Sequence, residues 1–240
     1  MDFTQINWPI VGLALSGGII VLLRDWRVTF PALLLNYVFV ALFLAQQQFI
    51  TPDLRLGNLA ISTTVLVKLI TGAAATVILT ITALTFSREY GLEELDEFSL
   101  TELRRAARRA QRQRAAEPFR FSNYVVAFWA LVLAALAALA LPRLYPIGRS
   151  YEIDFAWYWL GLSGLFTLVV AGDLLKIGLG LLLCAGSIDL LYSAIATTVQ
   201  VFPVALLNLM TIILALAVAY LSGLLYGRLK TLELNELYKR

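Results

Sequence analysis

Residues 121–141 read FSNYVVAFWALVLAALAALAL, a stretch that contains no charged side chain. A helix of this length spans about 30 Å, which is the thickness of the hydrocarbon core of a bilayer. Similar apolar segments recur along the whole chain. Together they cover residues 8–23, 28–47, 58–86, 121–141, 155–171, 174–198 and 201–226. The sequence therefore predicts an all-α fold, a polytopic transmembrane helical bundle of about seven spans.

The composition agrees with this fold class. The chain has 240 residues, of which 60% are hydrophobic and 15% charged, with a mean hydropathy of +0.80. A soluble domain would carry about 25% charged and about 45–50% apolar residues. The excess of apolar side chains requires an apolar solvent. Because the first residues, MDFTQINWPI, lack a basic segment, we expect the first apolar stretch to remain in the protein as an anchor.

The residue types also exclude several kinds of chemistry. The chain has no histidine, and Cys184 is its one cysteine. Haem ligation by histidine, histidine-based metal sites, Ser-His-Asp catalysis and disulfides within the chain are therefore excluded. Neither a Walker-type phosphate loop nor a GxGxxG motif occurs. We expect no bound cofactor, no metal and no catalytic residue in this chain.

The basic residues predict an orientation. With the N-terminus outside, only Arg55, Arg143 and Arg149 fall in outer loops and Lys68 falls within a span, which leaves fifteen of the nineteen Lys and Arg residues on the cytoplasmic side. Cytoplasmic loops of membrane proteins carry an excess of Lys and Arg. The sequence therefore predicts that the N-terminus lies outside and the C-terminus inside. An odd number of spans agrees with this.

The connection 87–120 is the one long polar segment. Its Ser99-Leu-Thr-Glu102 sequence is a capping box, which predicts that a helix begins there and continues over 99–116. Arginines crowd the polar faces of this helix, and they are Arg104, Arg105, Arg108, Arg109 and Arg112. The helix can be a cytoplasmic surface helix explained by the positive-inside rule alone, or it can bind anionic lipid headgroups or an acidic partner subunit. Nucleic-acid binding is not expected beside a membrane span.

The same connection divides the chain into parts. Residues 1–86 form an N-terminal half with three spans, and 87–120 form the cytoplasmic loop. Residues 121–154 hold the fourth span and an outer loop, and 155–240 form a second half with three spans. Leu-Ser-Gly occurs at 15–17 before Asp25 and again at 162–164 before Asp173. This similarity is as consistent with chance as with a parallel internal repeat.

Two ionisable residues lie inside predicted spans, where charges are costly and usually functional. Lys68 and Asp189 both lie about 13–15 Å from the outer ends of their predicted helices. Residues at equal depth can form an ion pair, which lowers the cost of burying each charge. The pair can belong to a proton or ion pathway, can be static, or can be absent if the two residues face different neighbours. Asn36 and Asn208 are further, weaker candidates for such a pathway.

The C-terminal half carries a recognisable pattern. Gly161-Leu-Ser-Gly-Leu-Phe-Thr-Leu ends one span, Ala171-Gly-Asp-Leu-Leu-Lys176 forms a short cytoplasmic turn, and Ile177-Gly-Leu-Gly-Leu-Leu-Leu-Cys-Ala-Gly-Ser-Ile-Asp-Leu190 begins the next span. This half resembles the K subunit of respiratory complex I and the C subunit of Mrp-type cation/proton antiporters. The whole chain looks like the hydrogenase-4 component E family, with Lys68 resembling that family's intramembrane lysine. The connection 87–120 departs from the family's pattern.

The resemblance implies an integral membrane subunit of a complex I-like, hydrogenase-like or Mrp-like assembly. Its partners would be antiporter-like membrane subunits and membrane lipids, and its location a bacterial inner membrane. K-like subunits carry a glutamate in the middle helix and an acid in the last helix. Here those positions hold Gly180 or Cys184, and Asn208 or Met210, so Asp189 is the acid that remains. A purely structural or docking subunit and a self-contained small-solute transporter are the alternatives.

Overall fold

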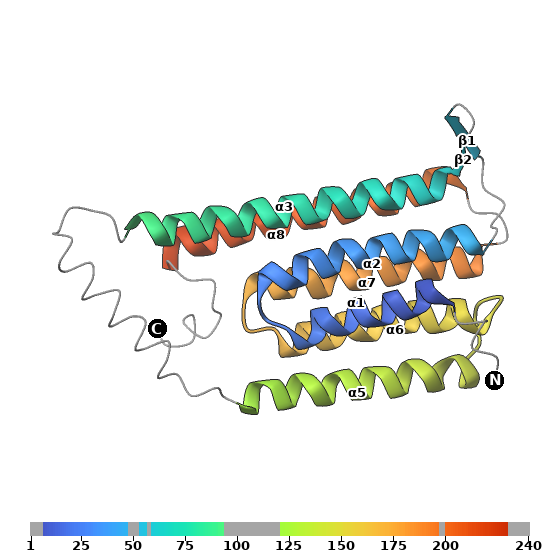
Figure 1. The fold of residues 1–240 in the computed structure, drawn as a ribbon, viewed down its shortest axis with the longest axis horizontal. Coiled ribbons are helices and arrows are strands. Elements are labelled where there is room, and N and C mark those ends of the chain that lie inside the picture. Colours follow the sequence, from blue (N-terminus) through green and yellow to red (C-terminus); the bar gives the residue numbers. More distant parts are fainter. Residues whose placement is uncertain (1–6, 48–52, 57–58, 94–120, 197–199, 230–240) are drawn as a thin grey trace.

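The computed structural model describes residues 7–47, 53–56, 59–93, 121–196 and 200–229. In these ranges the chain forms seven helices and one short antiparallel hairpin (Figure 1). The helices are α1 (Trp8–Leu22), α2 (Trp26–Gln46), α3 (Thr63–Glu93), α5 (Phe121–Leu144), α6 (Tyr151–Val170), α7 (Leu174–Ile195) and α8 (Val201–Leu229). The hairpin strands are β1 (Asp53–Leu56) and β2 (Leu59–Ser62).

Hydropathy and length make the chain a multi-pass membrane protein. Among the described helices, α2, α3, α5, α6, α7 and α8 are long and apolar enough to cross a bilayer. The helix α1 is apolar but has only 15 residues, and at about 1.5 Å per residue it reaches about 22 Å. Since a bilayer core is about 30 Å thick, α1 is short for a full span. The predicted helical bundle is confirmed.

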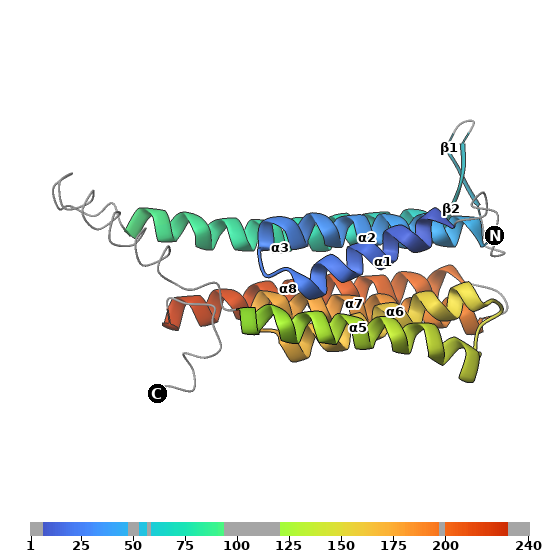
Figure 2. The ribbon, with the colours of Figure 1, turned by 60° about the horizontal axis from the view of Figure 1, so that its bottom comes forward.

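The helices form two layers (Figures 1 and 2). In one layer α2 packs between α1 and α3, and in the other the order is α5, α6, α7 and α8. The layers stack so that α1 lies on α6 and α3 lies on α8. The helices α1, α3, α6 and α8 all begin at the end of the bundle that carries the hairpin (Figure 1). The two three-helix sets therefore run in the same directions.

The order of the layers bears on the possible internal repeat. Two parallel halves related by a two-fold axis along the membrane normal would place α1 opposite α8. The structure places α1 opposite α6 and α3 opposite α8. Ser16 and Ser163, the serines of the two Leu-Ser-Gly stretches, do make the same local bond, each to the carbonyl oxygen three residues earlier at 3.1 Å. The three helices of each set therefore follow the same order across the two layers. A two-fold axis along the membrane normal would reverse this order in one layer.

Two predicted helix starts differ from the structure by four residues or more. The third helix begins at Thr63 and not at residue 58, because residues 59–62 form β2 and pair with β1. The helix α6 begins at Tyr151, four residues before the predicted start, because the Ser150 hydroxyl accepts a bond from the backbone N–H of Ile153 at 3.4 Å. Glu152 and Asp154 in its first turn also favour a helix N-terminus. Hydropathy excludes these polar residues from a span although they belong to the helix.

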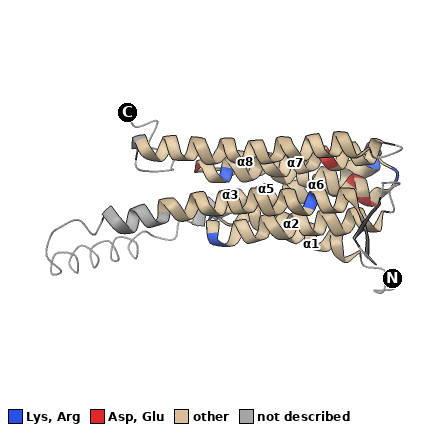
Figure 3. Cartoon of the chain, turned by 90° about the horizontal axis from the view of Figure 1, so that it is seen from above, with Lys and Arg blue, Asp and Glu red and all other residues tan. Residues whose placement is uncertain are grey.

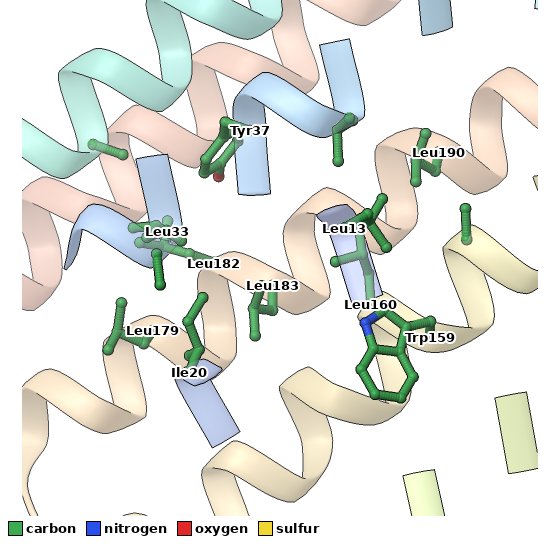
Figure 4. Close-up of a cluster of buried hydrophobic side chains, with 14 of the residues drawn as sticks. Leu13, Ile20, Leu33, Tyr37, Trp159, Leu160, Leu179, Leu182, Leu183 and Leu190 are labelled. Carbon is green, nitrogen blue, oxygen red and sulfur yellow. The ribbon is translucent and has the colours of Figure 1, made fainter. Parts of the chain in front are cut away.

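The core lies between the layers. Leu33 and Tyr37 of α2 lie across from Leu179, Leu182 and Leu183 of α7 (Figure 4). Close contact between α6 and α7 depends on two glycines. A Cβ atom on Gly164 would lie 2.8 Å from the carbonyl oxygen of Gly180, and one on Gly180 would lie 2.9 Å from that of Gly164. Small residues let membrane helices approach this closely.

Candidate functional site

Lys68 and Asp189 form an ion pair in the interior. Lys68 comes from α3 and Asp189 from α7, so the pair joins the two layers. Their side chains are 2% and 5% exposed, respectively. Elsewhere in the described bundle, charged residues gather mainly toward the two ends (Figure 3). A charge in this position is costly unless it is paired, so each residue makes the burial of the other possible.

Two further helices contribute to the same cluster. Asn208 of α8 donates its side-chain N–H to Oδ2 of Asp189 at 3.3 Å and to the carbonyl oxygen of Val204 at 2.8 Å. The Lys68 ammonium lies 5.7 Å from the ring centroid of Tyr37 on α2, which is within the range of a cation–π interaction. A Cβ atom on Gly72 would lie 2.4 Å from Cβ of Tyr37, so this glycine lets Tyr37 approach α3. The cluster is built where α2, α3, α7 and α8 meet.

Several oxygens of the cluster are buried without a hydrogen-bond partner among the described residues. They are Oδ1 of Asp189, Oδ1 of Asn208 and the hydroxyl of Tyr37. Buried polar atoms in native proteins nearly always have a partner, and a carboxylate oxygen left without one is especially costly. Oxygen atoms with free lone pairs beside a carboxylate can accept from a water or a hydronium ion, or can coordinate a monovalent cation. The cluster therefore has unused capacity to bind a transferable proton or ion.

The distances of Lys68 and Asp189 from the ends of their helices agree only in part with the prediction. Lys68 lies about 8 Å along α3 from its start at Thr63, and Asp189 about 9 Å along α7 from its end at Ile195. The expected equality of the two depths is confirmed. The expected absolute depth of about 13–15 Å is too large, because α3 begins later and α7 ends earlier than predicted. The pair thus lies much nearer to the hairpin end of the bundle.

The opposite part of the interior is apolar. From the pair, about 27 Å of α3 leads to Phe86 and about 22 Å of α7 leads to Leu174. Buried apolar side chains from all four helices fill this length, and they include Phe30, Leu33, Ala75, Leu79, Leu179, Leu182 and Ala215. Buried hydroxyls such as Thr76 and Ser222 also occur there. The pair is therefore closer to the hairpin end of the bundle than to the other end.

Asn36 lies apart from this cluster. Its side-chain N–H groups donate to the hydroxyl of Ser16 at 3.0 Å and to the carbonyl oxygen of Leu13 at 3.4 Å. Both partners belong to α1, so Asn36 links α1 to α2. Of the four predicted pathway residues, the structure brings together Lys68, Asp189 and Asn208.

The predicted cytoplasmic turn contains a second buried lysine. The Lys176 ammonium donates to the carbonyl oxygens of Val21 and Leu23, at 3.0 and 3.1 Å. These carbonyls end α1, so Lys176 caps a helix more than 150 residues away in the sequence. Asp173 caps α7 by accepting the backbone N–H of Lys176 at 2.7 Å. Burial raises the pKa of the Asp173 carboxyl above its usual 3.8, although this N–H and the charges of Lys176 and Arg24 act in the opposite direction.

The sequence did not single out Tyr37, the aromatic member of the ion-pair cluster. A tyrosine in an apolar helix is a weak signal, although its position next to Asn36 marks a polar spot in α2. The predicted arginine helix, with its cap at Ser99 and the side chains of Arg104, Arg105, Arg108, Arg109 and Arg112, lies outside the described residues. Within the described ranges, no group of three or more His, Cys, Asp or Glu side chains is placed to hold a metal ion.

Comparison of the chain with protein-family models, with curated proteins and with solved structures finds no match. The class that the fold and the cluster define is a polytopic helical membrane protein with a buried interhelical ion pair. Any finer assignment therefore depends on the chemistry of this chain's own residues.

Proposed function

We propose that this chain is an integral membrane subunit of an ion-translocating assembly of the complex I-like, hydrogenase-like or Mrp-like kind. In this proposal the Lys68–Asp189 pair is a site at which a proton or cation is held. The chain itself carries no catalytic group, and any redox reaction belongs to partner subunits. The membrane would be a bacterial inner membrane.

The observation that carries this proposal is the buried pair with unpartnered oxygens around it. A static pair would be most stable if every oxygen of its carboxylate were bonded. Here Asp189 uses Oδ2 for both Lys68 and Asn208, while its Oδ1 has no partner. An ammonium and a carboxylate in contact can exchange a proton, and each then becomes neutral. The cluster therefore supports transient binding of a proton or cation.

The need for partners follows from the apolar part of the interior. Because about 22–27 Å of largely apolar packing separates the pair from the far end of the bundle, the described helices favour a route from the pair to the hairpin end. A neighbouring subunit would have to supply the second half of the path. This agrees with the resemblance of residues 155–240 to subunits that function only in assemblies.

The test of the assembly is co-purification. The chain, tagged at its C-terminus and extracted in mild detergent, should elute in a large stable assembly that contains antiporter-like membrane subunits. Elution of the chain by itself as a monomer, together with solute transport by the purified chain in vesicles, would contradict the proposal. An unrelated multi-span protein with the same tag is the control for nonspecific association.

A purely structural subunit is the second candidate, and the dense apolar packing between α2 and α7 favours it. In that case the pair would hold the layers together and do nothing else. Translocation distinguishes the two candidates. A Lys68→Ala variant that still assembles should lose ion translocation if the pair handles ions, and should keep the wild-type rate if the pair is structural.

A further inference from the structure

A small cavity lies at the end of the bundle opposite the ion pair. It has a volume of about 170 Å³ and opens between the α1–α2 turn and the α6–α7 turn. Its polar lining comes from Arg24, Asp173, Lys176 and Thr29, and its apolar lining from Leu23, Trp26, Phe30, Leu175 and Leu179. One side of the cavity is therefore charged and the other is apolar.

The charged side has a net positive charge. Arg24 and Lys176 line the cavity together with Asp173. On the same turns, Arg27 and Asp25 lie outside the lining, and Asp25 is occupied by accepting the backbone N–H of Arg27 at 3.0 Å. These three bases and two acids leave an excess of one positive charge. An anion in the cavity would neutralise it.

Both basic side chains of the lining have donors to offer. Lys176 is 3% exposed as a residue, and two carbonyl oxygens accept from its ammonium group. An ammonium has three N–H donors, so one remains. The exposed Arg24 guanidinium lies beside the α6–α7 turn, because a Cβ atom on Gly172 would be 2.6 Å from its Nη2 atom. The two cations thus come from different layers and approach the same space.

The position of the cavity indicates the kind of ligand. The α6–α7 turn joins two helices long enough to span a membrane and the α1–α2 turn leads into a third, so the cavity lies at the level of the lipid headgroups. The rim of the cavity carries the half-buried apolar side chains of Leu23 and Trp26, whereas Phe30 and Leu179 form its buried base. A molecule with an anionic head and an apolar chain matches both sides, and anionic phospholipids are the molecules of this kind that surround a membrane protein.

We propose that this cavity binds the headgroup of one anionic phospholipid. The phosphate is held by Arg24 and Lys176, and the acyl chain leaves the cavity along the half-buried side chains of Leu23 and Trp26. The bound lipid links the α1–α2 turn to the α6–α7 turn and so joins the two layers at this end. This site is independent of the ion pair and of the proposed function.

The experiment compares two neighbouring arginines. Purified protein in detergent is titrated with phosphatidylglycerol, and bound lipid is counted by native mass spectrometry. Arg24→Gln removes a charge from the cavity lining, whereas Arg27→Gln removes the same charge from the same turn outside the lining. We expect Arg24→Gln to weaken phosphatidylglycerol binding at least tenfold and Arg27→Gln to change it less than twofold. Both arginines are exposed, so both variants should fold.

Four results would overturn the proposal. Equal weakening by the two substitutions would mean that general surface charge attracts the lipid. Equal binding of phosphatidylcholine would mean that the headgroup charge is not recognised. Displacement of the bound lipid by millimolar inorganic phosphate would mean that the site takes a free anion and not a lipid. No phosphatidylglycerol bound by the wild-type protein would also overturn it.

Discussion

Within the described part of the chain, the two buried lysines neutralise their charges in different ways. Lys68 meets the carboxylate of Asp189, whereas Lys176 meets two backbone carbonyl oxygens at the end of α1. A carboxylate left alone in the interior keeps a full charge. Carbonyl oxygens left alone at a helix end keep only partial charges, and at the edge of the bundle water can reach them. The same residue type therefore has a different energetic role at each site.

The largest expected effect is at the ion pair. Lys68→Met or Asp189→Asn alone should destabilise the protein by about 3–5 kcal/mol, because each change leaves a buried group without its partner. The double variant should be less destabilised than the sum of the two, and less than either one alone. Unfolding followed by tryptophan fluorescence in detergent measures these differences. Additive losses in the double variant would mean that the two residues do not interact.

A smaller effect is expected at the second lysine. Lys176→Met should cost about 2 kcal/mol, which is typical of hydrogen bonds from a charged group, since the carbonyls of Val21 and Leu23 can then bond to water. The same Lys→Met change at Lys68 is the matched comparison. A cost at Lys176 equal to or above that at Lys68 would contradict the distinction between the two sites.

Asp173, which caps the helix that carries Lys176, sharpens the comparison further. Asp173→Asn should be nearly neutral, because asparagine caps helices about as well as aspartate, whereas Asp173→Ala should cost about 1 kcal/mol. The raised pKa of the Asp173 carboxyl determines how the folding stability changes with pH. Below the ordinary pKa of 3.8 the carboxyl is neutral both folded and unfolded, and above its raised pKa the buried charge opposes folding. The wild type should therefore lose stability relative to Asp173→Asn as pH rises through this range. The opposite slope would contradict burial as the dominant cause.

The smallest effect on stability is expected from single cysteine substitutions that report the orientation of the chain in the membrane. In the predicted orientation Lys68 lies near the outer face and Lys176 near the cytoplasmic face. In a Cys184→Ala background, Tyr145→Cys in the exposed outer loop should react with a membrane-impermeant thiol reagent added to intact cells. Arg112→Cys, in the predicted cytoplasmic connection, should react only after lysis. Neither change should alter stability, and the reverse labelling pattern would overturn the predicted orientation.

The sequence predicts the helices well because hydropathy alone defines a span. It fails where polar residues belong to an element, as in the first turn of α6 with Glu152 and Asp154, and where a span gives way to a hairpin at residues 59–62. The equal depth of Lys68 and Asp189 is also readable, because depth depends only on residue counts. These features all follow from local sequence.

Contacts between helices that are distant in the sequence cannot be predicted from the sequence pattern in this way. Most of these helices are apolar on every side, so the pattern does not say which face meets which neighbour. Nothing in the sequence placed Tyr37 against Lys68, directed Asn36 toward α1, or carried Lys176 to the carbonyls of Val21 and Leu23. These contacts depend on how the two layers stack, which is set by the fit of side chains across the whole interface.

Ion translocation by the double variant Lys68→Ala/Asp189→Ala tests the central claim most directly. Removing both charges avoids the unpaired charge that would hinder folding or assembly in the single variants. The assembled complex is reconstituted in vesicles at a matched amount, and translocation is followed with a pH-sensitive dye. The account predicts normal assembly with translocation reduced at least tenfold. Wild-type translocation by the assembled double variant would show that the buried pair does not handle the ion.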